Sequence, residues 1–312
     1  MIPRAHREVP EAFCAPGPAA LGACRRRASR GLAAVIDAHH HVWDLRVRDQ
    51  DWITGPSLAP LRRNFSAADY RAAAPGVIAS VVVQTVTVPE ETPELLAQGF
   101  AGVVGWTDLT APDVADQIAR LRGLPGGGAL AGIRHQVQSE PDPGWLTRPD
   151  VLRGLAAVAD ASLVYDLVIT AGQLAAAAAA AAAVPQLRFV LDHLGKPPIV
   201  VGQVSPWAAD LRRLAALPNT SAKLSGLVTE ADWRHWQVAD LRPYADTALD
   251  AFGPDRLMFG SDWPVCTLAA GYDDVLAAAR DLTAALSPAE REAIFSGTAQ
   301  RIYGLRTGPV PP

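Results

Sequence analysis

Eight short apolar segments, each bounded by polar residues, glycine or proline, recur along the chain between residues 33 and 262. Sequences with helical periodicity separate most of them, for example residues 111–124, 148–162 and 243–253. Strands that alternate with helices predict βαβ units and a parallel sheet that is buried on both faces. Eight such units in about 250 residues match a (β/α)8 barrel, so we predict a TIM barrel of the α/β class over residues 33–312. The predicted strands are residues 33–41, 78–85, 101–108, 130–136, 163–169, 187–193, 220–226 and 256–262.

An open, doubly wound sheet is the alternative arrangement of the same elements. Its usual phosphate-binding sequence, Gly-x-Gly-x-x-Gly directly after the first strand, is absent from this chain. The glycine-rich stretch at residues 123–128 comes before a predicted strand and contains a proline, which is typical of a loop. These observations favour the barrel. Nine consecutive alanines at residues 175–183 predict a further helix between two of the strands.

Residues 1–32 differ from the rest, because they mix prolines, arginines and small residues without the period of a strand or a helix. We predict a flexible N-terminal extension there. The net charge of −4 gives no reason to expect nucleic acid or an anionic membrane as a partner. No stretch of about 18 or more apolar residues predicts a membrane span. The three cysteines suggest no disulfide framework, which is typical of a cytoplasmic protein.

Polar residues follow the predicted strands at the end where a barrel carries its active site, the carboxyl end. In a strand, side chains two residues apart share a face, so His39 and His41 point together while His40 turns away. The fifth strand contributes only Tyr165 and Asp166, which lie further back. The polar residues at the other strand ends are His39, His41, Gln84, Trp106, Asp108, Arg134, His135, Asp192, His193, Lys223, Ser225 and Asp262.

Two imidazoles on one face of a strand often supply two ligands of a metal site. A further histidine and a carboxylate then supply the remaining ligands. His193 and Asp262 are placed to complete such a site. A single histidine at a strand end is more often a hydrogen-bonded structural residue. Four candidate ligands at the same end of one barrel favour a common functional site instead.

The chain resembles a known family through nine motifs that occur in one order over residues 33–305. The family is the amidohydrolase-related family of sugar-lactone and dicarboxylate lactonases, which includes fuconolactonase-like enzymes. The resemblance implies a distorted (β/α)8 barrel of the metal-dependent hydrolase type and hydrolysis of a cyclic ester. One small departure, Thr298-Ala299 where the family often has Asn-Ala, lies away from the strand ends. The motifs are IDAHHHVWD, VVVQT, GVVGWTDL, GIRHQVQSEPDPGWL, YDLVI, FVLDHLGKP, KLSGLVTE, MFGSDWPV and GTAQRIYGL.

The resemblance implies either one bound divalent metal ion, with zinc favoured, or a metal-independent enzyme. The metal ligands would be His39, His41, His193 and Asp262. The fourth strand ends in Arg134 where binuclear relatives carry a bridging ligand, which disfavours a second ion.

The expected reaction is attack of water on the carbonyl of a small-molecule lactone. We expect Asp262 to act as the general base, and the three histidines to stabilise the oxyanion directly or through a metal. Arg134 would bind a carboxylate or ring oxygen of the substrate, and the alternative for its guanidinium is an ion pair with Asp192 or Asp108.

Further substrate contacts are expected from Lys223 and Gln84 at strand ends and from the aromatic faces of Trp43 and Trp106. The chain has 26 arginines but only two lysines, Lys196 and Lys223, which suggests that both lysines serve a purpose that arginine does not. Of the two, Lys223 lies on a strand and is the expected substrate contact, whereas Lys196 is expected to anchor a loop.

Two other functions use a similar set of residues. A decarboxylase of the same superfamily would release carbon dioxide from a carboxylated substrate. A non-catalytic barrel that binds a sugar acid would keep the aromatic residues and Arg134 but would not need Asp262. The presence of Asp262 beside three histidines favours the hydrolase.

Overall fold

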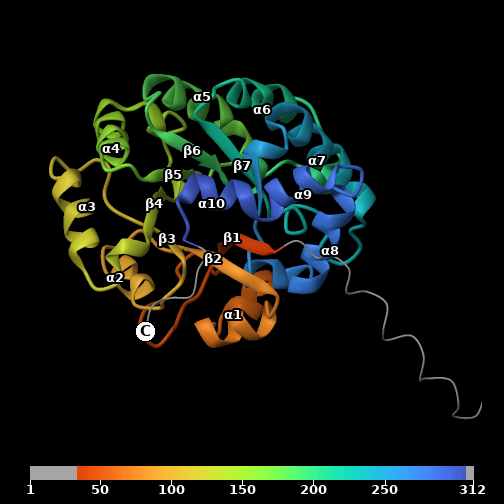
Figure 1. Ribbon diagram of the computed structural model, residues 1–312, viewed down its shortest axis with the longest axis horizontal. Helices are drawn as coiled ribbons and strands as arrows, with labels where there is room; N and C mark the ends of the chain where they lie inside the picture. Colours follow the sequence, from red (N-terminus) through yellow and green to blue (C-terminus); the bar gives the residue numbers. More distant parts are fainter. Residues whose placement is uncertain (1–33, 307–312) are drawn as a thin grey trace, which may run out of the picture. The chain divides into compact units, whose positions relative to one another are not determined.

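The computed structural model describes residues 34–306, which form eight parallel strands with helices between them (Figure 1). Each strand pairs with the next in sequence, in the order β1 to β8. All eight predicted strands are present, each shorter than or close to the expected range. The strands are β1 Val35–His40, β2 Val77–Val83, β3 Gly102–Gly105, β4 Leu130–His135, β5 Val164–Leu167, β6 Arg188–Leu191, β7 Thr220–Leu224 and β8 Leu257–Phe259.

The sheet closes into a barrel through the segment that follows β8. His40 forms a parallel bridge with Trp263, and the His41 amide donates to the Trp263 carbonyl at 2.7 Å. The Asp262 amide donates to the His39 carbonyl at 2.8 Å. These bonds satisfy backbone groups that an open sheet would expose at its edge. They also bring the ends of the first and last strands into direct contact.

Helices surround the barrel, as the helical patterns between the strands predict. The predicted helices at residues 111–124, 148–162 and 243–253 correspond to α3, α4 and α7, and the alanine run forms α5. The helices are α1 Ala67–Ala73, α2 Glu91–Leu96, α3 Val114–Gly123, α4 Pro149–Asp160, α5 Leu174–Ala183, α6 Trp207–Ala215, α7 Val238–Phe252, α8 Tyr272–Leu282, α9 Pro288–Glu292 and α10 Thr298–Tyr303.

The apolar core has two parts. The larger part lies between the strands and the surrounding helices. The smaller part fills the barrel interior with strand residues such as Ile36 and Val104, against which α10 packs Ile302 and Tyr303 (Figure 1). Apolar side chains share this interior with the buried strand residues Asp166 and Lys223, and polar side chains that follow the strands line the carboxyl end of the barrel.

None of the helices in residues 34–306 combines the length and the hydrophobicity that crossing a bilayer requires. The extension predicted for residues 1–32 lies outside the described residues.

Candidate active site

The alternation of side chains along β1 separates the three consecutive histidines. The Nε2 atoms of His39 and His41 lie 3.1 Å apart on the face that looks toward the barrel mouth. His40 faces the other way, where its Nε2 lies 3.1 Å from the Ser80 hydroxyl and its ring stacks on Tyr70 at 3.6 Å between centroids. The strand period alone predicts this division, and the structure shows it.

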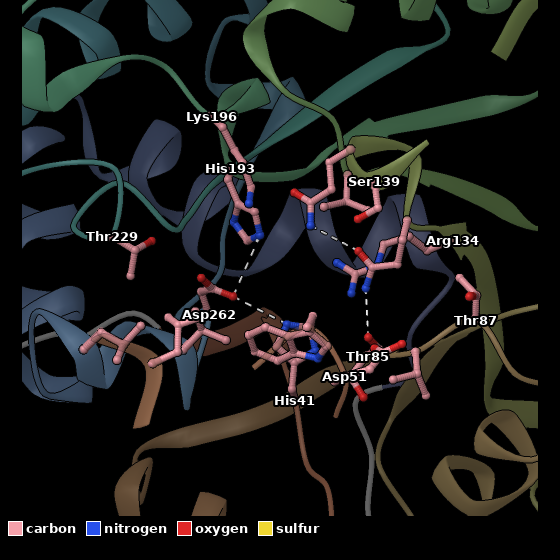
Figure 2. Close-up of a pocket in the computed structure, with 18 of the residues that line it drawn as sticks. His41, Asp51, Thr85, Thr87, Arg134, Ser139, His193, Lys196, Thr229 and Asp262 are labelled. Atoms are coloured by element: carbon pink, nitrogen blue, oxygen red, sulfur yellow. Dashed lines mark hydrogen bonds and ion pairs between the residues drawn. The ribbon is translucent and has the colours of Figure 1, made fainter. Parts of the chain in front are cut away.

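Asp262 completes a group of four potential ligands. Its Oδ1 atom lies 3.7 Å from Nε2 of His39, 3.5 Å from Nε2 of His41 and 3.8 Å from Nε2 of His193. In Figure 2, Asp262 stands between His41 and His193, and both ion pairs are drawn. All four side chains are buried. We refer to His39, His41, His193 and Asp262 as the histidine–aspartate cluster.

The spacing of three members of the cluster fits a metal ion. Metal–ligand bonds of about 2.0–2.1 Å place neighbouring ligand atoms of a tetrahedron ~3.3–3.4 Å apart. The ligand atoms of His39, His41 and Asp262 all lie within 4.8 Å of one another, and their separations of 3.1, 3.5 and 3.7 Å bracket that value. These three side chains therefore fit a single divalent ion, with Nε2 of His193 3.8 Å from the same carboxylate.

Contacts at the Nδ1 atoms of the three histidines orient their Nε2 atoms toward Asp262. Nδ1 of His41 lies 2.7 Å from the Val83 carbonyl, which can only accept, so this nitrogen carries the proton. Nδ1 of His193 lies 2.9 Å from the Ser225 hydroxyl, and Nδ1 of His39 lies 3.2 Å from Oδ1 of Asp192. Partners on the Nδ1 side are the usual way in which proteins orient metal-binding histidines.

A layer of buried charges lies behind His39. The Lys223 ammonium lies 2.5 Å from Asp166, 2.9 Å from Asp192 and 3.1 Å from Nδ1 of His39. Burial would raise the pKa of Asp192, but the charges of Lys223 and His39 outweigh it and hold this pKa well below its usual range. For Asp166, burial prevails over Lys223 and raises the pKa to about 6.

Lys223 and Gln84, which were expected to contact the substrate, lie in this layer and are not among the residues that line the cavity. Lys223 is fully buried, and its ammonium is surrounded by its two carboxylates and His39. Gln84 is also fully buried and accepts hydrogen bonds from Nε and Nη2 of Arg134 at 3.1 and 2.9 Å. Arg134 pairs with Asp192 at 2.9 Å, which is the ion pair that the sequence offered as the alternative.

Unusual backbone conformations position the ends of the cluster. Asp262 has a φ of 58°, and His193 has a φ of 52°, both in the left-handed region. Such a conformation costs roughly 1–2 kcal/mol per residue, so surrounding contacts must hold it. Asp37 supplies them for Asp262, because its carboxylate accepts from the Ser261 amide at 2.9 Å and from the Ser261 hydroxyl at 2.7 Å. Gly226 is required beside His193, since a Cβ atom there would lie 2.5 Å from Nδ1 of the ring.

Electrostatics keep the cluster ready to bind a cation or accept a proton. Burial lowers the pKa of His193 to about 4, despite the opposing charge of Asp262. Burial also lowers the pKa of His39 well below its usual value. For Asp262 burial acts in the opposite sense, but His193 and His41 outweigh it and lower the pKa. At neutral pH the cluster therefore combines neutral imidazoles at His39 and His193 with an ionised carboxylate at Asp262.

The cluster opens into a cavity of about 610 Å³ at the carboxyl end of the barrel. Its lining includes His41, His193, Asp262 and Arg134 (Figure 2). The loop after β2, with Thr85 and Thr87, forms another part of the wall. The other lining residues are Arg48, Asp49, Asp51, Trp52, Leu58, Val86, Val88, Gln136, Gln138, Ser139, Val168, Lys196, Thr229, Glu230, Trp233, Val265 and Leu268.

The two tryptophans that were expected to contact the substrate lie outside the cavity lining. Trp43 donates to the Arg63 carbonyl at 2.8 Å and packs on Phe65, and it does not line the cavity. Trp106 donates to Nδ1 of His135 at 3.0 Å and lies outside the lining as well. The tryptophans that line the cavity are Trp52 and Trp233, which come from the long loops after β1 and β7.

The cavity lining also includes two charged residues that the sequence did not predict as substrate contacts, Lys196 and Glu230. Lys196 follows His193 by three residues, and Glu230 lies five residues beyond Ser225. Their closeness in sequence to strand-end residues was the available signal. Lys196 lines the cavity and Lys223 does not, because a residue on a strand can also point into the packed interior.

Known proteins resemble this chain in sequence and in fold. A model of the amidohydrolase family matches residues 36–305. An L-fucono-1,5-lactonase of Burkholderia multivorans is 43% identical over 288 residues, which cover 86% of this chain and 96% of that protein. Another L-fucono-1,5-lactonase, from Burkholderia ambifaria, is 36% identical over 281 residues, covering 86% and 95% of the two chains. A crystal structure of a Burkholderia multivorans amidohydrolase with bound zinc has a TM-score of 0.82 and 42% identity, covering 88% of this chain and all of that one.

Proposed function

This chain belongs to the amidohydrolase family and is a hydrolase that opens a lactone ring, and from that premise we propose that its substrate is a neutral sugar lactone attacked by water at the histidine–aspartate cluster. The observation that carries the proposal is the convergence of this cluster on a cavity large enough for a sugar ring. Cavities of about 300–1,000 Å³ are typical for small-molecule sites.

Asp262 is the general base in this proposal. Its carboxylate is ionised, lines the cavity and lies within 4 Å of three imidazoles. It takes a proton from water as the oxygen of that water adds to the lactone carbonyl. Collapse of the resulting intermediate breaks the bond to the ring oxygen, which leaves as the new hydroxyl group after it receives a proton.

Arg134 acts mainly through its charge. Its guanidinium lines the cavity, but Gln84 and Asp192 occupy most of its N–H groups. A fixed positive charge beside the developing oxyanion stabilises it without reorganisation during the reaction. The role as a clamp for a substrate carboxylate, which the sequence suggested, is less suited to a guanidinium that is already engaged.

The same reasoning favours a neutral lactone over a carboxylated one. The other arginine of the lining, Arg48, donates from both Nη atoms to Glu94 at 3.0 and 2.9 Å. Carboxylates are commonly bound by the free fork of a guanidinium. The guanidinium groups of Arg48 and Arg134 already bind protein acceptors, so they are not free to bind a substrate carboxylate. The hydroxyl groups of a neutral lactone can instead use both hydrogen-bond donors and hydrogen-bond acceptors of the cavity.

We further propose that the histidine–aspartate cluster holds one divalent ion, with zinc favoured by imidazole and carboxylate ligands that leave a coordination position open. When bound, such an ion supplies Lewis-acid polarisation of the carbonyl and lowers the pKa of water. The protonation of His39 decides whether the cluster can hold it. A proton on Nδ1, toward Asp192, leaves Nε2 free for the ion, whereas a proton on Nε2 would face Asp262 instead.

The test is a panel of sugar lactones and dicarboxylate lactones, assayed by proton release with a pH indicator and corrected for uncatalysed opening. We expect turnover of sugar 1,5-lactones and little turnover of dicarboxylate lactones. Carbon dioxide release from a carboxylated substrate would favour the decarboxylase, and binding of lactones without turnover would favour a non-catalytic barrel. Metal analysis of the purified protein, with activity before and after chelation, tests the ion separately.

A further inference from the structure

Lys196 reaches the cavity through a left-handed turn. Four consecutive residues after Asp192 have positive φ angles: 52° at His193, 51° at Leu194, 71° at Gly195 and 53° at Lys196. The Lys196 amide donates to the His193 carbonyl at 2.9 Å and closes the turn. A turn of this kind has about three residues per revolution, so its first and fourth side chains lie on one side. His193 and Lys196 accordingly both line the cavity, while Leu194 is fully buried (Figure 2).

The Lys196 ammonium stands beside a second charged group without a hydrogen bond to it. Nζ lies 3.9 Å from Oε1 of Glu230, with 29% of the lysine side chain and 27% of the glutamate side chain exposed. This distance exceeds the ~3.2 Å limit of a good hydrogen bond. Both residues also line the cavity, so a ligand bound there can reach the ammonium and the carboxylate.

A cation and a carboxylate at this distance are complementary to hydroxyl groups. An ammonium can only donate and an ionised carboxylate can only accept, whereas a hydroxyl does both. One hydroxyl placed between them can accept from Lys196 and donate to Glu230. A group that bears a single charge would be attracted to one member of the pair and repelled by the other.

We propose that Lys196 and Glu230 form the subsite that recognises the hydroxyl group on the carbon next to the lactone carbonyl. This inference rests on the proposed function, because Asp262 places the reacting carbonyl. Lys196 shares its turn with His193, whose Nε2 lies 3.8 Å from Asp262, so the pair adjoins the reacting centre. Thr229 and Trp233 come from the same loop as Glu230 and also line the cavity, where they form a wall suited to a sugar ring. The substrate class is thus a sugar lactone with a free 2-hydroxyl group.

The experiment compares L-fucono-1,5-lactone with its 2-deoxy analogue in the wild type and in the variants Lys196→Met and Glu230→Gln. We expect each variant to lower kcat/KM for the hydroxylated lactone by about 10- to 100-fold, the usual effect of losing a hydrogen bond to a charged group. The 2-deoxy lactone lacks that hydroxyl, so the variants should open it at close to the wild-type rate. The double variant should lose less than the product of the two single losses, since both residues bind one group.

Glu292→Gln is the matched control, because Glu292 is exposed at the end of α9, and both lactones should keep their wild-type rates. Equal losses on both lactones in Lys196→Met and Glu230→Gln would overturn the subsite, since they would indicate a general effect on catalysis or folding. Unchanged rates on the hydroxylated lactone would overturn it as well. A wild-type protein that opens neither lactone would instead overturn the proposed function.

Discussion

Nδ1 of His39 lies 3.2 Å from Oδ1 of Asp192, so a buried carboxylate stands directly behind the ring whose Nε2 faces Asp262. Arg134 and Lys223 hold that carboxylate in turn, at 2.9 Å each. The position of one imidazole is therefore fixed by a chain of charges that begins on β4 and β7 and ends at the barrel mouth. Replacing any residue of this chain of charges should change both the stability of the fold and the position of His39 in the site.

Asp192→Asn should destabilise the fold strongly. The change leaves the charges of Lys223 and Arg134 buried with one carboxylate fewer, and breaking a buried ion pair typically costs about 3–5 kcal/mol. Urea unfolding of the two proteins measures the difference. Asp150→Asn is the control, because its partner Arg148 is a surface residue and such pairs contribute little. Equal unfolding free energies for wild type and Asp192→Asn would contradict the structural role of this layer.

Ser225→Ala should weaken metal binding without a large effect on folding. The hydroxyl of Ser225 lies 2.9 Å from Nδ1 of His193, and loss of such a partner typically costs 10–100-fold in metal affinity. Zinc affinity by competition with a chelating dye is the measurement. Ser80→Ala removes an equivalent contact from His40, which lies on the other face of β1, and should leave zinc affinity unchanged. The idea fails if the two variants bind zinc equally well.

Asp262→Asn should retain the fold and lose most lactonase activity. General bases typically contribute about 10²–10⁴-fold, and the amide keeps the size of the side chain but accepts no proton. Steady-state rates on the best sugar lactone, together with circular dichroism, test this expectation. Near wild-type turnover by a folded Asp262→Asn protein would remove Asp262 from the mechanism.

The three consecutive histidines at the end of β1 should respond differently to alanine. His39→Ala and His41→Ala remove cluster ligands and should abolish activity. His40→Ala should cost mainly stability, about 0.5–3 kcal/mol, because His40 packs on Tyr70 away from the cavity. Activity and urea unfolding of all three variants give the comparison. An inactive His40→Ala beside an active His39→Ala or His41→Ala would reverse the face assignments along β1.

Acid should destabilise the protein through its buried histidines. Burial and, second, the charge of His41 hold the pKa of His40 well below its usual value of about 6.5. Below pH ~6.5 the unfolded chain binds a proton there that the native protein does not, so this residue's contribution to stability is lost as pH falls. Each such histidine adds a slope of up to about 1.4 kcal/mol per pH unit. Buried carboxylates with raised pKa, such as Asp166, act in the opposite sense, so the test is a difference between variants.

His40→Gln should therefore flatten the dependence of the unfolding free energy on pH between about 6.5 and 4.5, relative to the wild type. His235→Gln is the matched control, because the His235 side chain is 78% exposed, and its pH dependence should remain that of the wild type. Identical slopes in His40→Gln and the wild type would show that His40 is not buried in its neutral form.

The sequence by itself determined the barrel and the four side chains that meet at its mouth. A period of two along β1 places His39 and His41 on one face, whatever surrounds them. Parallel strands of one barrel end at the same side, so His193 and Asp262 had to approach that pair once eight strands were recognised. These inferences need only the local periodicity of the strands and the closure of the sheet, and the sequence pattern indicates both.

Only the tertiary structure decided what surrounds the cluster. Lys223 and Lys196 both lie near strand ends in the sequence, yet packing directs the first behind His39 and a left-handed turn directs the second into the cavity. The loops after β1 and β7 likewise bring Trp52 and Trp233 to the cavity rather than Trp43 and Trp106. The course of a loop depends on contacts with distant residues, and no period in the sequence records those contacts.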